Sequence, residues 1–188
     1  MSKTTELVVI GGSWGGIHAS LEILQELPEN YSIPIVLVLH RLRNYEGSLQ
    51  ELFAKKLNLQ VIEIEEKEQI KSGFLYIAPA NYHVLLENDR TFSLDVSDLV
   101  NFSRPSIDVT FTSAVAVFGD SVAGILLSGA SKDGSTGLKN IADAGGIAIV
   151  QDPAEAEVDT MPRSAIDIIP DCSILNLKSI KEYLLSLT

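Results

Sequence analysis

The sequence predicts an α/β fold, namely a doubly wound, mostly parallel sheet with helices on both faces and an antiparallel hairpin insert. Three observations support this class. Four short runs are almost continuously aliphatic, which is typical of parallel strands that are buried on both faces. Segments with helical spacing of apolar residues alternate with these runs. Residues 82–96, by contrast, have the pattern of two strand arms around a turn. We expect residues 1–188 to form one such domain.

The four aliphatic runs are the expected strands of the parallel sheet. They occupy residues 6–10, 34–39, 122–127 and 147–150. Parallel neighbours cannot be joined by a tight turn, so the segments between them should cross a face of the sheet, usually as helices. Ligand sites in such sheets lie beyond the carboxyl ends of the strands, which directs attention to the residues that follow each run.

Each expected helix combines an apolar face with an end signal. The first has apolar residues at positions 17, 21 and 24 and stops before Pro28. The signals for the other four are a Ser48/Glu51 capping box, an apolar face from Ile107 to Phe118, an apolar face from Leu138 that ends before Gly145, and a Ser179/Glu182 capping box.

The expected hairpin has arms at residues 82–87 and 91–96, joined by Asn88-Asp89-Arg90. Its second arm alternates apolar residues at positions 92, 94 and 96, which indicates one buried and one solvated face. The mixed-charge run at residues 63–71 is expected to be a solvated strand end and turn.

The composition is that of a globular chain with an acidic excess. Of its 188 residues, 25 are acidic and 14 basic, which gives a formal charge of −11. Nucleic-acid binding draws on Lys and Arg, and anionic membranes repel acidic surfaces, so we expect neither partner. The start, MSKTTELVVIGG, lacks a signal-peptide pattern, and no apolar run reaches the roughly 18–20 residues that span a bilayer. The only cysteine, Cys172, fits a reducing compartment. These features predict a cytoplasmic protein without membrane insertion.

The first aliphatic run leads into Gly-Gly-Ser-Trp-Gly-Gly at residues 11–16. Four glycines in six residues indicate a tight turn, for which two interpretations remain open. It could be an anion cradle at a helix N-terminus, although Ser13 replaces the second glycine of the dinucleotide fingerprint and no Walker A lysine is present. It also matches G-x-S-x-G, the nucleophile elbow that presents a serine hydroxyl above a sheet edge.

A serine nucleophile needs a base, and the chain has three histidines. His40 directly follows an aliphatic run, so it should lie at a carboxyl end beside the glycine-rich turn. His18 falls on the first expected helix, where an exposed position is the simpler interpretation. His83 opens the hairpin, where a structural role or a substrate contact would fit. Position favours His40 as the base, and a histidine that merely ends a strand is the alternative.

A third group must orient the imidazole, and Asp133 is the candidate. It lies in Ser-Gly-Ala-Ser-Lys-Asp-Gly-Ser at residues 128–135, again directly after an aliphatic run. Capping the next helix is the ordinary role of such an aspartate, but Ser135 offers another cap that would leave Asp133 free. Three strand-end loops thus supply Ser13, His40 and Asp133.

With these residues identified, the sequence resembles the catalytic domain of the chemotaxis protein-glutamate methylesterases, the CheB family. The resemblance runs from Val8 to about Ile169. It is carried, in order, by residues 10–16, the strand that ends at residue 40, residues 78–83, 104–111 and 126–134, and a closing motif at residues 161–165.

The resemblance implies a serine hydrolase that removes methyl esters from glutamate side chains on chemoreceptor-like helices through an acyl-enzyme. Some members of the family also deamidate glutamine. Matched by motif, Ser13 is the nucleophile, His40 the general base and acid, and Asp133 the orienting carboxylate. The implied oxyanion donors are backbone N–H groups near Trp14 and Ala130.

Two further residues, His83 and Arg104, are candidate substrate contacts, and we expect neither a metal nor a cofactor. The sequence also departs from the family pattern. Trp14 stands where Thr or Ser is usual, Arg41 and Leu42 replace Met-Pro after the histidine, and residues 129–131 read Gly-Ala-Ser in place of Gly-Met-Gly. These changes bear on substrate choice and leave the triad intact.

No receiver domain precedes Val8, so we expect a stand-alone enzyme that is either constitutive or controlled by a separate regulatory protein. A non-catalytic signalling or scaffold module with the same fold is the alternative from another functional class. A nucleotide-binding domain built on residues 11–16 is a third hypothesis, and it would need an acidic ribose partner where His40 stands.

Overall fold

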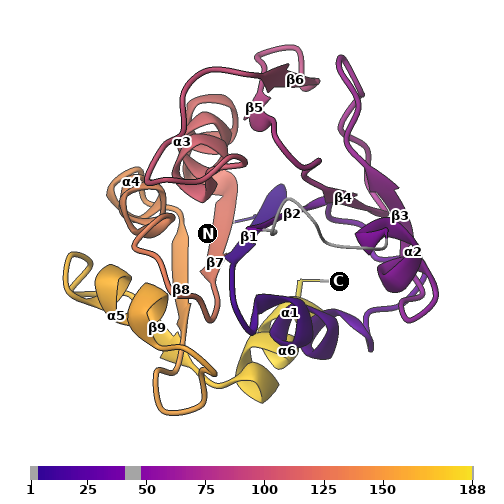
Figure 1. Cartoon of the computed structure of the whole chain (residues 1–188). Helices are drawn as coiled ribbons and strands as arrows, with labels where there is room; N and C mark the ends of the chain where they lie inside the picture. The colour runs from indigo at the N-terminus through magenta and orange to yellow at the C-terminus, as the bar shows by residue number, and fades with distance from the viewer. Residues whose placement is uncertain (1–3, 41–47, 188) are drawn as a thin grey trace.

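The computed structural model describes residues 4–40 and 48–187. Its centre is a seven-stranded sheet in the order β3-β4-β2-β1-β7-β8-β9, in which every neighbouring pair is parallel (Figure 1). The strands are β1 (Leu7–Gly12), β2 (Ile35–Leu39), β3 (Gln60–Glu63), β4 (Phe74–Ile77), β7 (Val122–Leu126), β8 (Ile147–Gln151) and β9 (Ser173–Leu175). The chain builds outward from β1 on one side and then returns to build from β1 on the other, so the doubly wound class is confirmed.

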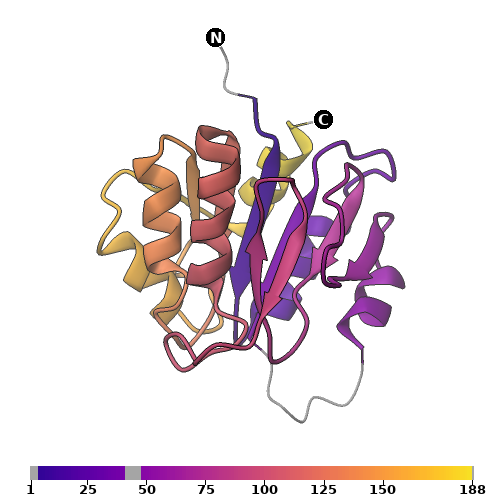
Figure 2. The same ribbon diagram turned by 90° about the horizontal axis from the view of Figure 1, so that it is seen from above.

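Helices cover both faces of this sheet. One face carries α1 (Gly16–Leu24), α2 (Leu49–Ala54) and α6 (Leu177–Leu185). The other carries α3 (Ile107–Phe118), α4 (Ser135–Asp143) and α5 (Thr160–Ile166), together with the antiparallel pair β5 (His83–Leu86) and β6 (Phe92–Asp95). Figure 2 shows α3, α4 and the β5–β6 hairpin side by side over the sheet. Each face therefore has its own apolar core.

Alternation along the strands divides the aliphatic residues between these two cores. In β1, Val8 and Ile10 pack toward α1 and α6, whereas Leu7 and Val9 pack toward α3. All four side chains are fully buried. A strand that is covered on both sides has no solvated face, which explains why the sequence shows continuous aliphatic runs there.

Most of the expected helix ends are found in the structure. The Ser48 hydroxyl caps α2 by accepting the N–H of Glu51, and Gly145 follows α4 with a φ of +85°. The expected start of the last helix is wrong. Asn176 caps α6 by accepting the N–H of Ser179, and the earlier start lets Leu177 join the core.

Three short strands and one helix, α5, were not expected from the sequence. β3, β4 and β9 have only three or four residues each, too few for a periodic pattern to stand out. The charged run at residues 63–71 does end β3 and form a largely exposed turn. The expected hairpin is present, but as a separate two-stranded sheet.

Among the residues described, no helix is long and apolar enough to cross a membrane.

Candidate active site

Three strand ends meet where the strand order reverses. β1 has β2 on one side and β7 on the other, and open α/β sheets bind ligands in such a crevice. Ser13 follows β1, His40 follows β2, and the loop with Asp133 follows β7. The N–H of His40 donates to the carbonyl of Gly12 at 3.1 Å. The N–H of Ser13 donates to the carbonyl of Ser128 at 2.9 Å. The three loops that the sequence assigned to one edge of the sheet therefore meet there.

Strand alternation sets the direction of the side chains at this edge. Val9 of β1 and Val38 of β2 pack into the core on the α3 side. Continuing the two-residue period directs Ser13 and His40 to that same side. Ile107, the first residue of α3, lies close by. A Cβ on Gly11 would stand only 2.5 Å from its Cγ2 methyl carbon. Glycine at position 11 is what allows α3 to begin this near to β1.

The turn after β1 is shorter than expected, because its first two glycines still belong to the strand. Gly15 has a φ of +78°, and a Cβ there would lie 2.7 Å from the Ser128 hydroxyl oxygen. α1 begins at the next residue, so Ser13 occupies a strand-to-helix turn, as in a nucleophile elbow. Within residues 4–40 and 48–187, no hydrogen bond of the Ser13 hydroxyl is found, to His40 or to any other group.

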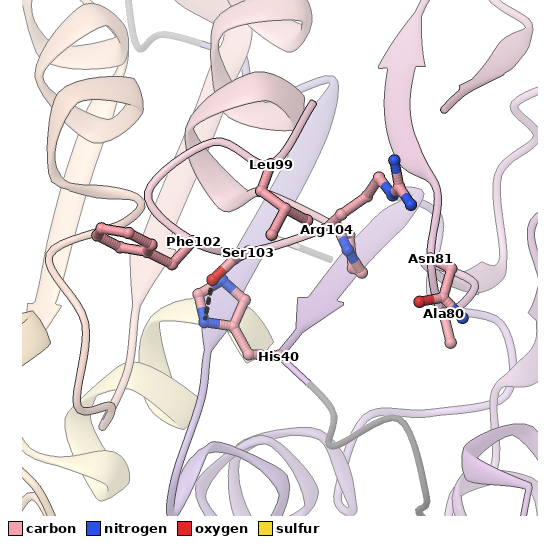
Figure 3. A pocket seen from close by; sticks show the side chains of 8 residues that line it. His40, Ala80, Asn81, Leu99, Phe102, Ser103 and Arg104 are labelled. Carbon is pink, nitrogen blue, oxygen red and sulfur yellow. Dashed lines mark hydrogen bonds between the residues drawn. The ribbon is translucent and has the colours of Figure 1, made fainter. Parts of the chain in front are cut away.

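An imidazole–carboxylate pair lies beside that turn. His40 Nε2 is 2.8 Å from Asp133 Oδ2, with the His40 side chain 13% exposed and that of Asp133 fully buried. Since Nε2 is bound to the carboxylate, Nδ1 is the ring nitrogen left to accept a proton. The common Ser-His-Asp template uses the two nitrogens the other way round. The hydroxyl oxygen of Ser103 stands 3.4 Å from Nδ1 (Figure 3).

Asp133 is held by the N-terminus of α3. Its Oδ2 accepts the N–H of Ile107 at 2.6 Å, and its Oδ1 accepts the Ser106 hydroxyl at 2.7 Å. Burial works to raise the pKa of Asp133, but hydrogen bonds from His40, from the hydroxyl and from the N–H outweigh it and hold the pKa below its usual value. The N-cap residue of α4, the helix that follows Asp133, is Gly134, so neither Asp133 nor Ser135 plays the capping role considered for them.

Sequence reasoning missed a second carboxylate, that of the partly buried Asp108. It accepts the N–H groups of Gly134 at 3.0 Å and Gly137 at 2.7 Å, at the start of α4. The Asn101 amide donates to Asp108 at 2.9 Å and to Asp133 at 3.3 Å. Burial, together with the nearby charge of Asp133, raises the pKa of Asp108 to about 6. An acidic residue in the first turn of a helix is ordinary, so its local pattern did not mark it.

Two backbone N–H groups near Ser13 are free of backbone partners in the part of the chain that the structure describes. They belong to Trp14 and Ala130, the residues expected to supply oxyanion donors. The N–H of Gly129, by contrast, donates to the carbonyl of Val158 at 3.0 Å. A Cβ on Gly129 would lie 2.9 Å from the Ser13 Cβ, so this loop packs directly on the serine. The role of the Trp14 and Ala130 N–H groups as oxyanion donors remains a prediction.

The histidines other than His40 lie in different surroundings. His83 is 1% exposed, its Nδ1 accepts the N–H of Ser106 at 3.1 Å, and its Nε2 donates to the Asp98 carbonyl at 3.0 Å. Because both ring nitrogens are used inside the protein, the structure favours the structural role over the expected substrate contact. His18 is exposed on α1.

Arg104 borders a cavity of about 160 Å³ beside His40 (Figure 3). Its Nη1 donates to the carbonyls of Val96 and Ser97, each at 2.7 Å, and the guanidinium points away from His40. Arg104 thus closes the loop between β6 and α3, and its contact with substrate remains a prediction. No cluster of three or more His, Cys, Asp or Glu side chains that could hold a metal ion occurs among the described residues.

The indole of Trp14 is 62% exposed and tied to a neighbouring loop. Its Nε1–H donates to Glu157 Oε1 at 2.7 Å. Glu157 lies between β8 and α5, far from Trp14 in sequence, so no local pattern linked the two. Arg41 and Leu42, the departures noted after the histidine, fall outside the described residues.

Comparison with known proteins shows what the chain is similar to. A family model for CheB methylesterase matches residues 8–184. A putative protein-glutamate methylesterase/protein-glutamine glutaminase of Leptospira interrogans is 48% identical over 182 residues, covering 97% of this chain and 94% of that protein. A protein-glutamate methylesterase/protein-glutamine glutaminase from Carboxydothermus hydrogenoformans is 36% identical over 94% of this chain and 54% of its own length. The crystal structure of the Thermotoga maritima CheB methylesterase catalytic domain matches with a TM-score of 0.92 and 34% identity, covering 98% of this chain and 100% of that one.

Proposed function

Because the chain belongs to the CheB methylesterase family and is thus an ester hydrolase, we propose that it removes methyl groups from esterified glutamate side chains of a chemoreceptor-like protein. Ser13, His40 and Asp133 are the proposed triad. The observation that carries this proposal is the 2.8 Å contact between His40 and a fully buried Asp133, one strand away from Ser13. The named activities of the relatives supply the substrate class.

Acylation begins when Ser13 Oγ attacks the ester carbonyl carbon and His40 Nδ1 accepts the hydroxyl proton. The negative charge that develops on the carbonyl oxygen is stabilised by the N–H groups of Trp14 and Ala130. The tetrahedral intermediate collapses, the bond to the methoxy oxygen breaks, and the proton on His40 Nδ1 passes to that oxygen. Methanol leaves, and the glutamyl group stays on Ser13 as an ester.

Deacylation repeats these steps with water as the nucleophile. His40 Nδ1 takes a proton from the water, the oxyanion forms again at the same donors, and the Ser13 oxygen leaves with the proton from His40. The products are the free serine and a glutamic acid side chain, which releases its proton to water and becomes a carboxylate. Throughout, His40 Nε2–H donates to Asp133, whose low pKa keeps it ionised and able to stabilise the imidazolium.

Methanol release from a methylated receptor fragment tests this proposal. Wild type should release methanol, and Ser13→Ala should lose about 10⁴–10⁶ in kcat, as serine hydrolases do when the nucleophile is removed. Retention of the wild-type rate by Ser13→Ala would refute the assignment. A small ester of the glutamate side chain should follow the same pattern, because the chemistry acts on the ester itself.

A second activity is favoured by the names of the relatives, which include protein-glutamine glutaminase. The same triad can attack a glutamine amide, with His40 protonating the departing ammonia. Ammonia release from an unmethylated receptor fragment measures it, and loss in Ser13→Ala would place both reactions at one site. Absence of ammonia with normal methanol release would limit the chain to ester hydrolysis.

A scaffold module that keeps the fold without turnover is the competing hypothesis. It predicts receptor binding together with no reaction toward a serine-directed probe. The buried, ionised Asp133 favours the enzyme, because a binding module has no need for an oriented imidazole.

A further inference from the structure

An exposed aromatic residue stands at the tip of a tight turn between β6 and α3. The N–H of Val100 donates to the carbonyl of Ser103 at 3.1 Å, and the N–H of Ser103 donates back at 2.9 Å. The two residues between them, Asn101 and Phe102, have φ angles of +48° and +62°. Positive φ at both central positions is the arrangement of a type I′ turn, which favours Asn-Gly. Phe102 is 98% exposed.

Phe102 is therefore poorly suited to its own place in the fold. A bulky residue with positive φ is strained, and glycine would adopt this conformation freely. The ring also gains almost nothing from burial, because nearly all of it remains in contact with water. A side chain that is unfavourable in both respects is better explained by a contact outside the chain.

The turn lies directly at the proposed active site. Phe102 and Ser103 line both the cavity beside His40 and a second hollow formed with Ala130 and Lys132. Figure 3 shows Phe102 projecting from the same loop that carries Ser103 over His40. A protein substrate that enters the cavity beside His40 meets this ring, because Phe102 lines that cavity.

The base of the turn is anchored to the catalytic groups. The Asn101 amide donates to Asp108 at 2.9 Å and to Asp133 at 3.3 Å. On the other flank, the Ser103 hydroxyl is 3.4 Å from His40 Nδ1. These contacts position the turn that carries the ring relative to the triad.

We propose that Phe102 is a docking residue for the protein substrate, and that its ring packs against an apolar side chain next to the esterified glutamate. This inference rests on the proposed function, since it requires the ester at Ser13. The partner is argued from the relatives, whose named substrates are proteins, and from the two hollows on either side of the ring. Lys132 borders the second hollow and is exposed, and its positive charge suits the carboxylates expected near an esterified glutamate.

The experiment compares a methylated receptor fragment with a small ester, the N-acetyl, N′-methylamide of glutamate γ-methyl ester. The small ester lacks the apolar side chains that flank the esterified glutamate in a protein. In Phe102→Ala, the ratio of kcat/KM on the protein to kcat/KM on the small ester should fall about 5–30-fold, the loss typical of an aromatic anchor, through a rise in KM. Ile168→Ala, in the turn that follows α5, removes another exposed hydrophobic side chain and should leave the ratio as it is.

Phe102→Gly separates docking from a structural role, because the two predict opposite signs. Glycine relieves the positive φ, so the melting temperature should rise while the same ratio falls. An unchanged ratio in both Phe102 variants, or equal losses on both substrates, would overturn the proposal.

Binding to a chain with Ser13→Ala tests docking without turnover. Calorimetry should show about 5–30-fold weaker binding of the methylated fragment when Phe102→Ala is added. Equal affinities would reject Phe102 as a docking residue whether or not Ser13 is the nucleophile. Full activity in Ser13→Ala alone would instead reject the proposed function.

Discussion

Asp108 and Asp133 bind each other's helices: each carboxylate accepts N–H groups at the N-terminus of the helix that contains or follows the other aspartate. Asp133, which precedes α4, accepts the N–H of Ile107 at the start of α3, and Asp108, which lies in α3, accepts the N–H groups of Gly134 and Gly137 at the start of α4. The N-terminus of α3 thus binds the carboxylate of Asp133, and the N-terminus of α4 binds that of Asp108. The exchange fixes the loop after β7 against α3, and it explains how Asp133 can be fully buried and still face His40.

The raised pKa of Asp108 predicts a specific pH dependence of stability. Between the usual value of 3.8 and about 6, the folded chain keeps a proton on Asp108 that the unfolded chain has released. The folded state then binds more protons, so the contribution of Asp108 to the free energy of unfolding falls as pH rises through this interval. Asp108→Asn cannot titrate, and its stability relative to wild type should therefore increase from about pH 4 to about pH 6. Urea unfolding of both proteins across this range measures the difference, and parallel curves would show that Asp108 is not perturbed.

Replacing the Asp133 carboxylate by an amide, in Asp133→Asn, should remove most of the activity. The neutral amide could no longer stabilise an imidazolium at His40, and the usual cost of this change in a Ser-His-Asp site is about 10⁴ in kcat. Initial rates of methanol release measure it. Ser106→Ala is the matched control, because it removes only one of the hydrogen bonds to Asp133 and should cost far less. Similar rates in the two variants would remove Asp133 from the triad.

Adding one methyl group at Gly11 should disturb the site through the backbone. The new Cβ would stand 2.5 Å from Ile107 at the start of α3, the same residue whose N–H binds Asp133. We expect Gly11→Ala to lower the free energy of unfolding by about 1–3 kcal/mol, as overpacking does, and to lower kcat as well. Gly119→Ala is the control. Its Cβ meets nothing within 4 Å and its φ is +57°, so it should lose some stability and keep kcat. The prediction fails if kcat is the same in both variants.

The side chain of Trp14 should affect substrate binding more than chemistry. Its proposed oxyanion donor is a backbone N–H, which Trp14→Thr keeps. We therefore expect kcat within a few-fold of wild type and a rise of about 5-fold or more in KM for a methylated protein, as for other aromatic contacts. Glu157→Gln retains an acceptor for the indole and should change KM little. A large fall in kcat with a constant KM would show that the substitution had altered the turn itself.

The sequence predicted the parallel strands and the edge of the sheet where the site lies, because burial on both faces and strand-end loops leave strong local patterns. His40 was assigned by its place directly after a strand, and the register of β1 and β2 bears out that place. The short strands β3, β4 and β9 were missed because each has too few residues for a period to show.

What the sequence could not show are contacts between distant segments. Asp133 was weighed as the cap of its own helix, whereas it binds the helix on the other side of the site, an exchange that depends on how α3 and α4 pack. Asp108, Ser103 and Glu157 acquire their partners in the same way, through folding rather than through neighbours in sequence. For His83 the sequence left a structural role and a substrate contact open, and only the fold shows that both ring nitrogens have partners inside the protein.

The most direct measurement is the identity of the side chain that a serine-directed fluorophosphonate labels. Ser13 and Ser103 both lie near His40, and the chemistry proposed here requires an activated hydroxyl at Ser13 alone. Intact-mass analysis followed by peptide mapping should find one adduct, on Ser13, and none in Ser13→Ala. An adduct on Ser103, or the same labelling of wild type and Ser13→Ala, would contradict the account.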